Sequence, residues 1–273
     1  MALYVNESGP ASAPALVFLH GGGGGGWMWQ PQLEAFSDYH CLTPDLPEHG
    51  RSAEVKPFTI AGSAALIADL IRTRAHGGRA HVVGLSEGAQ IIVALLAATP
   101  EVVDHAVISS ALVRPIPGMR FIRPRLIAWM IDLYMPFKDS EFWVRANMKG
   151  YGVPDQFYPQ FKEITRQMTT AQFVNILVEN QRFRLPAGLE RARAPTLVVA
   201  GKHEYGIMRQ SVRDVAAAIP GAKGCLVVHG RRLGLAQEHN WNLAAPELFN
   251  QTVRAWITDS PLPAFLQPMA VSP

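Results

Sequence analysis

A serine lies at the centre of the segment Gly84-Leu85-Ser86-Glu87-Gly88, which follows a short apolar run and opens an apolar helical pattern. A serine at a tight turn from strand to helix is held in strained backbone geometry, and glycines two residues away on either side relieve clashes with neighbouring elements. Its hydroxyl then projects beside the free N–H groups of the helix. The spacing predicts that Ser86 is a nucleophile. The alternative is a serine that only caps the helix.

A run of six glycines, residues 21–26, follows His20 and a second apolar run. Because glycine has no Cβ, this backbone can approach a ligand closely. No Lys-Ser or Lys-Thr follows the run, which argues against a phosphate loop. Ahead of a GxSxG serine, such a segment supplies one of two N–H donors for an oxyanion. We expect the donors to be the amides of Gly22, or of Gly23 in its place, and of Glu87. His20 is expected to brace the loop.

Two histidines compete for the role of base. His239 lies in a loop after the last predicted strand, and His229 ends that strand. We favour His239, because a ring carried by a loop can swing over the nucleophile. Four others are expected to be structural or solvated: His40, His76, His81 and His105.

The acid that orients the base is expected to be Glu204, three residues beyond the glycine that ends another apolar run. Its carboxylate would hold the imidazole and stabilise its protonated form. Glu238 is the weaker alternative, because a side chain adjacent to His239 usually points elsewhere. The predicted catalytic residues are therefore Ser86, Glu204 and His239, without a metal ion or another cofactor.

Short apolar runs rich in β-branched residues alternate with helical patterns along most of the chain. Strands are predicted at residues 16–19, 81–85, 106–108, 196–200 and 225–228, and helices at residues 60–75, 87–98, 208–219 and 247–257. Near-continuous hydrophobicity is typical of strands buried on both faces, and the alternation implies parallel pairing with crossover helices. The sequence predicts an open α/β sheet.

This alternation is interrupted over residues 113–189, where several helical patterns are broken by prolines. We expect a helical lid over the carboxyl end of the sheet, with residues 1–112 and 190–260 forming the core and residues 261–273 a flexible tail. A substrate pocket under a lid is mostly apolar, so at least four of the lid's large side chains should line it. The candidates are Met119, Phe121, Trp129, Met130, Met135, Phe137, Phe142, Trp143, Met148, Phe157, Phe161 and Met168.

The composition is typical of a globular protein and argues against a disordered or nucleic-acid-binding one. Of 273 residues, 48% are hydrophobic and 17% charged, which fits one globular domain and argues against disorder. The net charge of +3 comes from scattered arginines, so no nucleic-acid partner is expected. Cys41 and Cys225 lie far apart in different predicted strands, which favours free thiols in the cytoplasm over a disulfide. Neither a signal peptide nor a membrane span is expected, and a homodimer is left open.

The chain resembles the α/β-hydrolase superfamily, in particular its small lidded bacterial esterase-like members. The resemblance covers residues 14–112 and 195–258 and rests on the glycine loop, the Ser86 turn, the segment Pro44-Asp45-Leu46-Pro47-Glu48-His49-Gly50-Arg51-Ser52, residues 201–204 and His239-Asn240-Trp241. It implies the α/β-hydrolase fold with a mostly parallel eight-stranded sheet, a Ser-His-acid triad and no cofactor. The chain departs from the family pattern where Glu48 replaces a glycine, where Gln237 and Glu238 precede the histidine, and where the acid is Glu.

These residues predict a serine hydrolase that cleaves an ester, thioester or lactone of a small to medium apolar acyl substrate through an acyl-enzyme. The same scaffold hosts several chemistries, so two other classes stay open. One is a lyase or cyclase of secondary metabolism that uses His239 as a base without acylation. The other is a ligand-binding pseudoenzyme.

Overall fold

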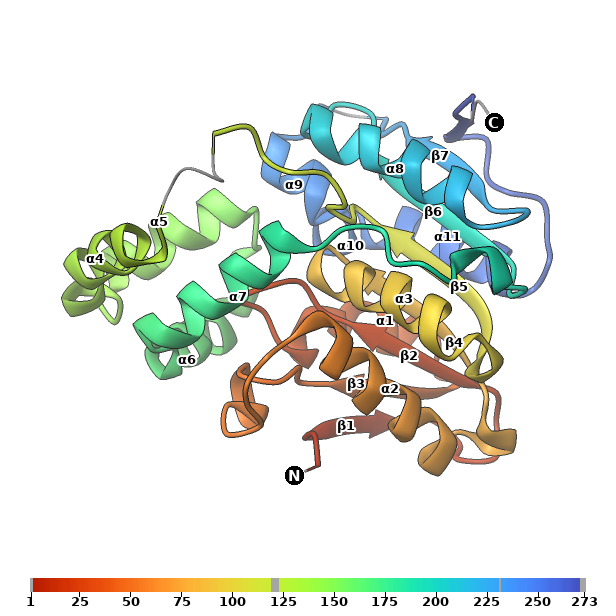
Figure 1. Cartoon of the computed structure of the whole chain (residues 1–273), viewed down its shortest axis with the longest axis horizontal. Coiled ribbons are helices and arrows are strands. Elements are labelled where there is room, and N and C mark those ends of the chain that lie inside the picture. Colours follow the sequence, from red (N-terminus) through yellow and green to blue (C-terminus); the bar gives the residue numbers. More distant parts are fainter. Residues whose placement is uncertain (1, 119–122, 231, 271–273) are drawn as a thin grey trace.

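The computed structural model describes residues 2–118, 123–230 and 232–270. Eight strands form one twisted sheet in the order β1-β3-β2-β4-β5-β6-β7-β8 (Figure 1). The inner strands pair in parallel, and β1 and β8 pair antiparallel at the two edges, so the predicted mostly parallel α/β sheet is confirmed. The strands are β1 (Val5–Ser8), β2 (Ala15–Leu19), β3 (His40–Pro44), β4 (Ala80–Leu85), β5 (Val103–Ser109), β6 (Thr196–Gly201), β7 (Lys223–Val227) and β8 (Leu266–Pro268).

Helices cover both faces of the sheet because its strands are apolar on both sides. Successive strand residues point to opposite faces, so Val82 packs in one buried cluster and Val83 in the other. The first cluster includes side chains of α2 (Ile60–Arg74), α3 (Glu87–Ala98) and α8 (Gly206–Ala218). The second includes side chains of α11 (Pro246–Ile257) and of the segment around α1 (Gln30–Ala35).

Four helices lie between β5 and β6 in the chain and project together to one side of the sheet (Figure 1). They are α4 (Pro124–Tyr134), α5 (Glu141–Tyr151), α6 (Tyr158–Gln167) and α7 (Thr170–Arg182). These helices fall within the segment predicted as a lid, of which residues 119–122 are outside the described residues.

The flexible tail predicted for residues 261–273 is wrong for Leu266–Pro268, which form β8. Leu266 pairs with Val227 of β7, and its side chain is buried. The strand is only three residues long and ends in a proline. An edge strand tolerates proline, which has no N–H group, because one side of its backbone forms no hydrogen bonds with another strand. Residues 271–273 lie outside the described residues.

Both cysteine residues, Cys41 in β3 and Cys225 in β7, are buried and form no disulfide. Across the described ranges, none of the helices has the length and the apolar character that crossing a bilayer requires.

Candidate active site

Ser86 occupies the sharp turn between β4 and the buried helix α3. Its backbone angles are φ 55° and ψ −110°, a left-handed conformation that costs a non-glycine residue of the order of 1–3 kcal/mol. The strained turn expected from the sequence is therefore confirmed. A Cβ on Gly88 would lie 2.2 Å from the carbonyl oxygen of Leu19, and one on Gly84 would lie 2.5 Å from the carbonyl oxygen of Gly88. The two glycines are required because the turn packs directly on backbone.

Gly88→Ala should destabilise the protein by about 1–3 kcal/mol, because backbone atoms must move to admit the methyl group. Urea unfolding followed by circular dichroism measures the change. Gly150→Ala is the matched control, since a Cβ there meets nothing within 4 Å and alanine suits a helix better than glycine. Equal unfolding free energies for the two variants would contradict this explanation of the GxSxG spacing.

Glu204 and His239 form a direct pair. Glu204 Oε1 lies 2.5 Å from His239 Nδ1, so Nδ1–H donates and leaves Nε2 as the proton acceptor. The other carboxylate oxygen, Oε2, accepts from Ser110 Oγ at 2.8 Å and from the Gly201 amide at 3.1 Å. The carboxylate is fully buried, whereas 16% of the His239 side chain is exposed. A buried and hydrogen-bonded carboxylate thus orients a ring that stays partly exposed.

The rival residues form a separate pair. His229 Nε2 lies 3.8 Å from Glu238 Oε2, and both side chains are buried. Glu238 Oε2 also accepts from the His203 amide at 3.2 Å and therefore supports the turn that carries Glu204. Neither His229 nor Glu238 lines the cavity that holds Ser86. The position predicted for His239 differs slightly, because it is the last residue of the short helix α9 (Leu235–His239) rather than part of a loop.

The glycine loop runs beside Ser86, since a Cβ on Gly21 would lie 3.4 Å from the Cβ of Ser86. The Gly23 amide donates to His49 Nε2 at 3.1 Å, so the structure argues against Gly23 as an oxyanion donor. Within residues 2–118, 123–230 and 232–270, the amides of Gly22 and Glu87 have no recorded hydrogen-bond acceptor. These two amides remain the candidate oxyanion donors.

Two buried histidines hold the glycine loop. His20 Nδ1 donates to the Gly21 carbonyl at 2.8 Å, and its Nε2 accepts from the Leu46 amide at 2.9 Å. Burial lowers the pKa of His20 to about 4 and that of His49 to about 3. Both rings are therefore neutral at pH 7, with one nitrogen donating and one accepting. His20 braces the loop as expected, and His49 is a second brace.

The side chain of Glu87 is buried below the same loop. Its Oε2 accepts from Asn180 Nδ2 of α7 at 2.8 Å, and its Oε1 lies 3.5 Å from His49 Nε2. Burial raises the pKa of Glu87 to about 8, so the group is mainly protonated at neutral pH. Glu87 thus joins His49, which holds the glycine loop, to one of the inserted helices without placing a full charge in the core.

A cavity of about 490 Å³ lies between the glycine loop and the inserted helices. Ser86 and His239 both line it. Four of the large side chains singled out in the sequence are also in its wall: Met130, Met135, Phe161 and Met168. Polar groups are few, and the hydroxyl of Tyr134 is one of them, accepting from Asn147 Nδ2 at 2.8 Å. The cavity suits a substrate with an apolar body of small to medium size.

Comparison with known proteins agrees with this arrangement of strands and helices. Residues 16–262 match the model of the Alpha/beta hydrolase family. The chain belongs to the α/β-hydrolase family.

Three similar proteins illustrate the range of this α/β hydrolase's relatives. An AB hydrolase superfamily protein of Gibberella zeae is 28% identical over 91% of this chain and 82% of its own length. An esterase of Mycobacterium tuberculosis is 33% identical over 36% of this chain and 33% of its own length. A thermophilic esterase of Thermogutta terrifontis has the same fold, with a TM-score of 0.70, 18% identity, and coverage of 94% of this chain and 93% of that one.

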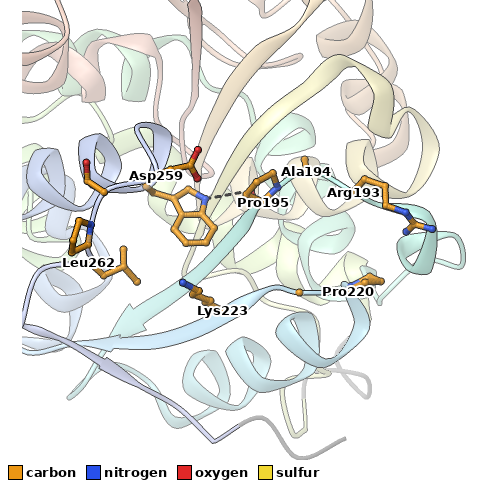
Figure 2. A pocket seen from close by; sticks show the side chains of 11 residues that line it. Arg193, Ala194, Pro195, Pro220, Lys223, Asp259 and Leu262 are labelled. Atoms are coloured by element: carbon orange, nitrogen blue, oxygen red, sulfur yellow. Dashed lines mark hydrogen bonds between the residues drawn. The ribbon is translucent and has the colours of Figure 1, made fainter.

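A larger hollow of about 590 Å³ lies at the other end of the sheet of this α/β hydrolase (Figure 2). Pro195, which precedes β6, and Lys223, which starts β7, are part of its wall, and the Trp256 indole N–H donates to the Pro195 carbonyl at 3.3 Å. In α/β sheets of this type the reactive groups gather at the carboxyl ends of the strands, whereas these residues lie at the amino ends. The hollow therefore does not belong to the candidate active site.

Glu87→Gln should remove a pH dependence from the stability of this α/β hydrolase. The pKa of Glu87 is raised from 4.5 to about 8, so its contribution is fully present below pH 4.5 and is lost as the pH rises towards 8. Between pH 5 and 8 the wild type should lose on the order of 1 kcal/mol per pH unit relative to the variant. Urea unfolding at pH 5, 6, 7 and 8 measures both curves, and parallel curves would show that Glu87 is not protonated.

Proposed function

We propose that this α/β hydrolase cleaves an ester, thioester or lactone bond of a small to medium apolar substrate through an acyl-enzyme on Ser86. The observation that carries the proposal is the Glu204–His239 pair at the cavity that also holds Ser86. The hydrogen bond to Glu204 fixes the ring with Nε2 unprotonated, which is the state that a general base requires.

In the proposed reaction, His239 Nε2 takes the proton of the Ser86 hydroxyl as Oγ attacks the substrate carbonyl carbon. The resulting oxyanion accepts hydrogen bonds from the amides of Gly22 and Glu87. Protonated His239 then gives its proton to the leaving group, and the carbonyl re-forms as the acyl-enzyme. A water molecule, deprotonated by His239, cleaves the acyl-enzyme and restores Ser86.

The apolar wall of the cavity favours an acyl or alcohol portion built mainly of carbon. Methionine side chains are flexible and can adapt to substrates of different shape, and Met130, Met135 and Met168 contribute three of them. We propose that residues 113–189 act as the lid of this site, since α4–α7 supply most of the wall opposite the glycine loop. The partial match to a protein named as an esterase supports an ester as the first substrate to test.

A fluorophosphonate probe tests the acyl-enzyme step directly. We expect stoichiometric labelling that peptide mass spectrometry assigns to Ser86, and a covalent mass increase on Ser86 after mixing with slowly hydrolysed acyl donors. Ser86→Ala, with its cavity otherwise intact, should take up no probe and should lose turnover of p-nitrophenyl esters of two to eight carbons.

The same experiment separates the other two classes of function. A pseudoenzyme would leave Ser86 unlabelled while still binding a ligand. A lyase or cyclase that uses His239 alone would keep its turnover in Ser86→Ala. Either result would contradict the proposed mechanism.

A further inference from the structure

Three potential metal ligands lie together at the amino ends of two central strands, at the opposite end of the sheet from Ser86. They are His81 near the start of β4, and Asp104 and His105 near the start of β5. Each residue offers one nitrogen or oxygen atom, and these three atoms lie within 4.8 Å of one another. Ser86 lies five positions after His81 along β4 and the turn that follows it, a distance of about 16 Å in extended chain. The cluster is thus distinct from the candidate active site.

A local irregularity in the sheet brings the three side chains together. The register between β4 and β5 shifts between the pairs Ala80–Val103 and Val82–Ala106. One residue of β4, His81, therefore lies opposite two residues of β5. Adjacent strand residues normally point to opposite faces, but a bulge of this kind re-aims one of them. Asp104 and His105 can then both approach His81.

The histidine nitrogens in this cluster are suited to metal binding. His81 is only 7% exposed, and its Nδ1 has no hydrogen-bond partner among the described residues. The ring centroids of His81 and His105 are 5.1 Å apart.

His105 is oriented by a carboxylate from outside the cluster. Its Nε2 lies 3.4 Å from Asp259 Oδ1, and its buried Nδ1, which has no hydrogen-bond partner, lies 3.9 Å from Asp104 Oδ1. A carboxylate on one ring nitrogen holds the proton there and leaves the other nitrogen for a metal, as is common around zinc. Asp259 also borders the hollow of Figure 2.

We propose that His81, Asp104 and His105 bind a divalent transition-metal ion, with Zn²⁺ as the best match. Two imidazoles and one carboxylate are ligands that zinc accepts, whereas Mg²⁺ and Ca²⁺ prefer oxygen ligands alone. In a tetrahedral site with zinc–ligand bonds of 2.0–2.2 Å, the donor atoms are about 3.4 Å apart. Side-chain rotations that move the donor atoms by about 1 Å would bring all three within bonding distance of one zinc ion.

Solvent can supply the fourth ligand. A surface hollow of about 300 Å³ is lined by His76, His81 and Asp104 and gives a metal ion and a water molecule access to the cluster. Asp104 also has a neighbouring cation, Arg79, whose Nη2 lies 3.4 Å from Asp104 Oδ1 with both side chains about half exposed. The ion would link β4 to β5 at the amino ends of the strands, and Asp259 would connect the segment after α11 to the same point.

The test uses tag-free full-length protein and Co²⁺ as a spectroscopic probe, followed by calorimetric titration with Zn²⁺. We expect one site per chain, visible absorption of tetrahedral Co²⁺ that Zn²⁺ abolishes, and a rise in Tm of about 5 °C at a metal concentration near 100 times Kd. His105→Gln should weaken binding by about 100-fold or more, and Asp259→Asn by about 10–100-fold.

Two controls make the result specific. His76→Gln removes a histidine of the same hollow that is outside the cluster, and it should keep the wild-type affinity. His239→Gln should also keep it, which excludes metal binding by the Glu204–His239 pair. The metal-free Tm and the ester hydrolysis of His105→Gln should match those of wild type, showing that the variant folds. Absence of a tetrahedral Co²⁺ spectrum, or an affinity unchanged in His105→Gln, would overturn the proposal.

Discussion

His239→Gln should lower kcat/KM for p-nitrophenyl esters by about 10⁴–10⁶-fold. The variant retains a side chain of similar size but has no group that can take the proton of the Ser86 hydroxyl. The loss should fall on kcat more than on KM, because the base acts in the transition state and not in ground-state binding. Steady-state kinetics at pH 7.5, supported by burst-phase measurements of the acyl-enzyme, give the two parameters separately.

His229→Gln is the matched control for this prediction. His229 is buried beside Glu238 and does not line the cavity, so its replacement should change kcat/KM by less than about 10-fold. A large loss of activity in His229→Gln together with near-normal activity in His239→Gln would show that His229, and not His239, is the base. In that case the order of residues along the chain would not identify the triad.

Glu204→Gln should reduce kcat by about 10⁴-fold while the fold stays intact. The carboxylate accepts the Nδ1 proton of His239 in the wild type, at 2.5 Å. A glutamine amide can instead donate to Nδ1, which moves the ring proton to Nε2 and leaves no lone pair facing the nucleophile. Its carbonyl oxygen can still accept from Ser110 Oγ, so the unfolding free energy should change much less than kcat does.

Glu238→Gln distinguishes the two buried glutamates. Glu238 accepts from the His203 amide, a role that a glutamine carbonyl can also fill, so kcat should remain within about 10-fold of wild type. An equal fall of activity in the two glutamate variants would mean that the effect comes from the stability of this turn and not from orientation of the base.

The central strands of the fold were predictable because each is a continuous apolar run buried on both faces. Residues 81–85 and 196–200 agree with β4 and β6 to within one residue. The strands β1, β3 and β8 have no comparable continuous apolar run. β1 is an edge strand with the polar sequence VNES, β3 mixes histidine and threonine with apolar residues, and β8 has three residues. Their pairing is determined by neighbouring strands more than by their own composition.

The Ser86 turn was predictable because its glycines and flanking elements are adjacent in the chain. The polar contacts below the glycine loop were not, since they join residues far apart in sequence. Glu48 is the clearest case. The chain has glutamate where the family pattern has glycine, and Glu48 adopts a positive φ of 63°. Its carboxylate accepts from Asn175 Nδ2 of α7 at 2.8 Å, an interaction that helps to offset the backbone strain.

Glu87 shows the same limit of sequence reasoning. It was singled out for its amide, and only the folded chain places its carboxyl between His49 and Asn180. An acidic residue at the start of an otherwise apolar helix was the one available signal, and it is equally typical of a favourable helix N-terminus. The position of Asn180, more than ninety residues along the chain, is required to distinguish the two roles.

The placement of β8 has a consequence for how the protein associates with itself. This strand occupies one side of β7, whose backbone N–H and C=O groups would otherwise face solvent as a template for another chain. A chain shortened before Leu266 would keep Ser86, Glu204 and His239 but would expose that template. Such a truncated protein should form oligomers at high concentration through strand-to-strand contacts. The C-terminal segment therefore covers a strand edge that could otherwise pair with another chain.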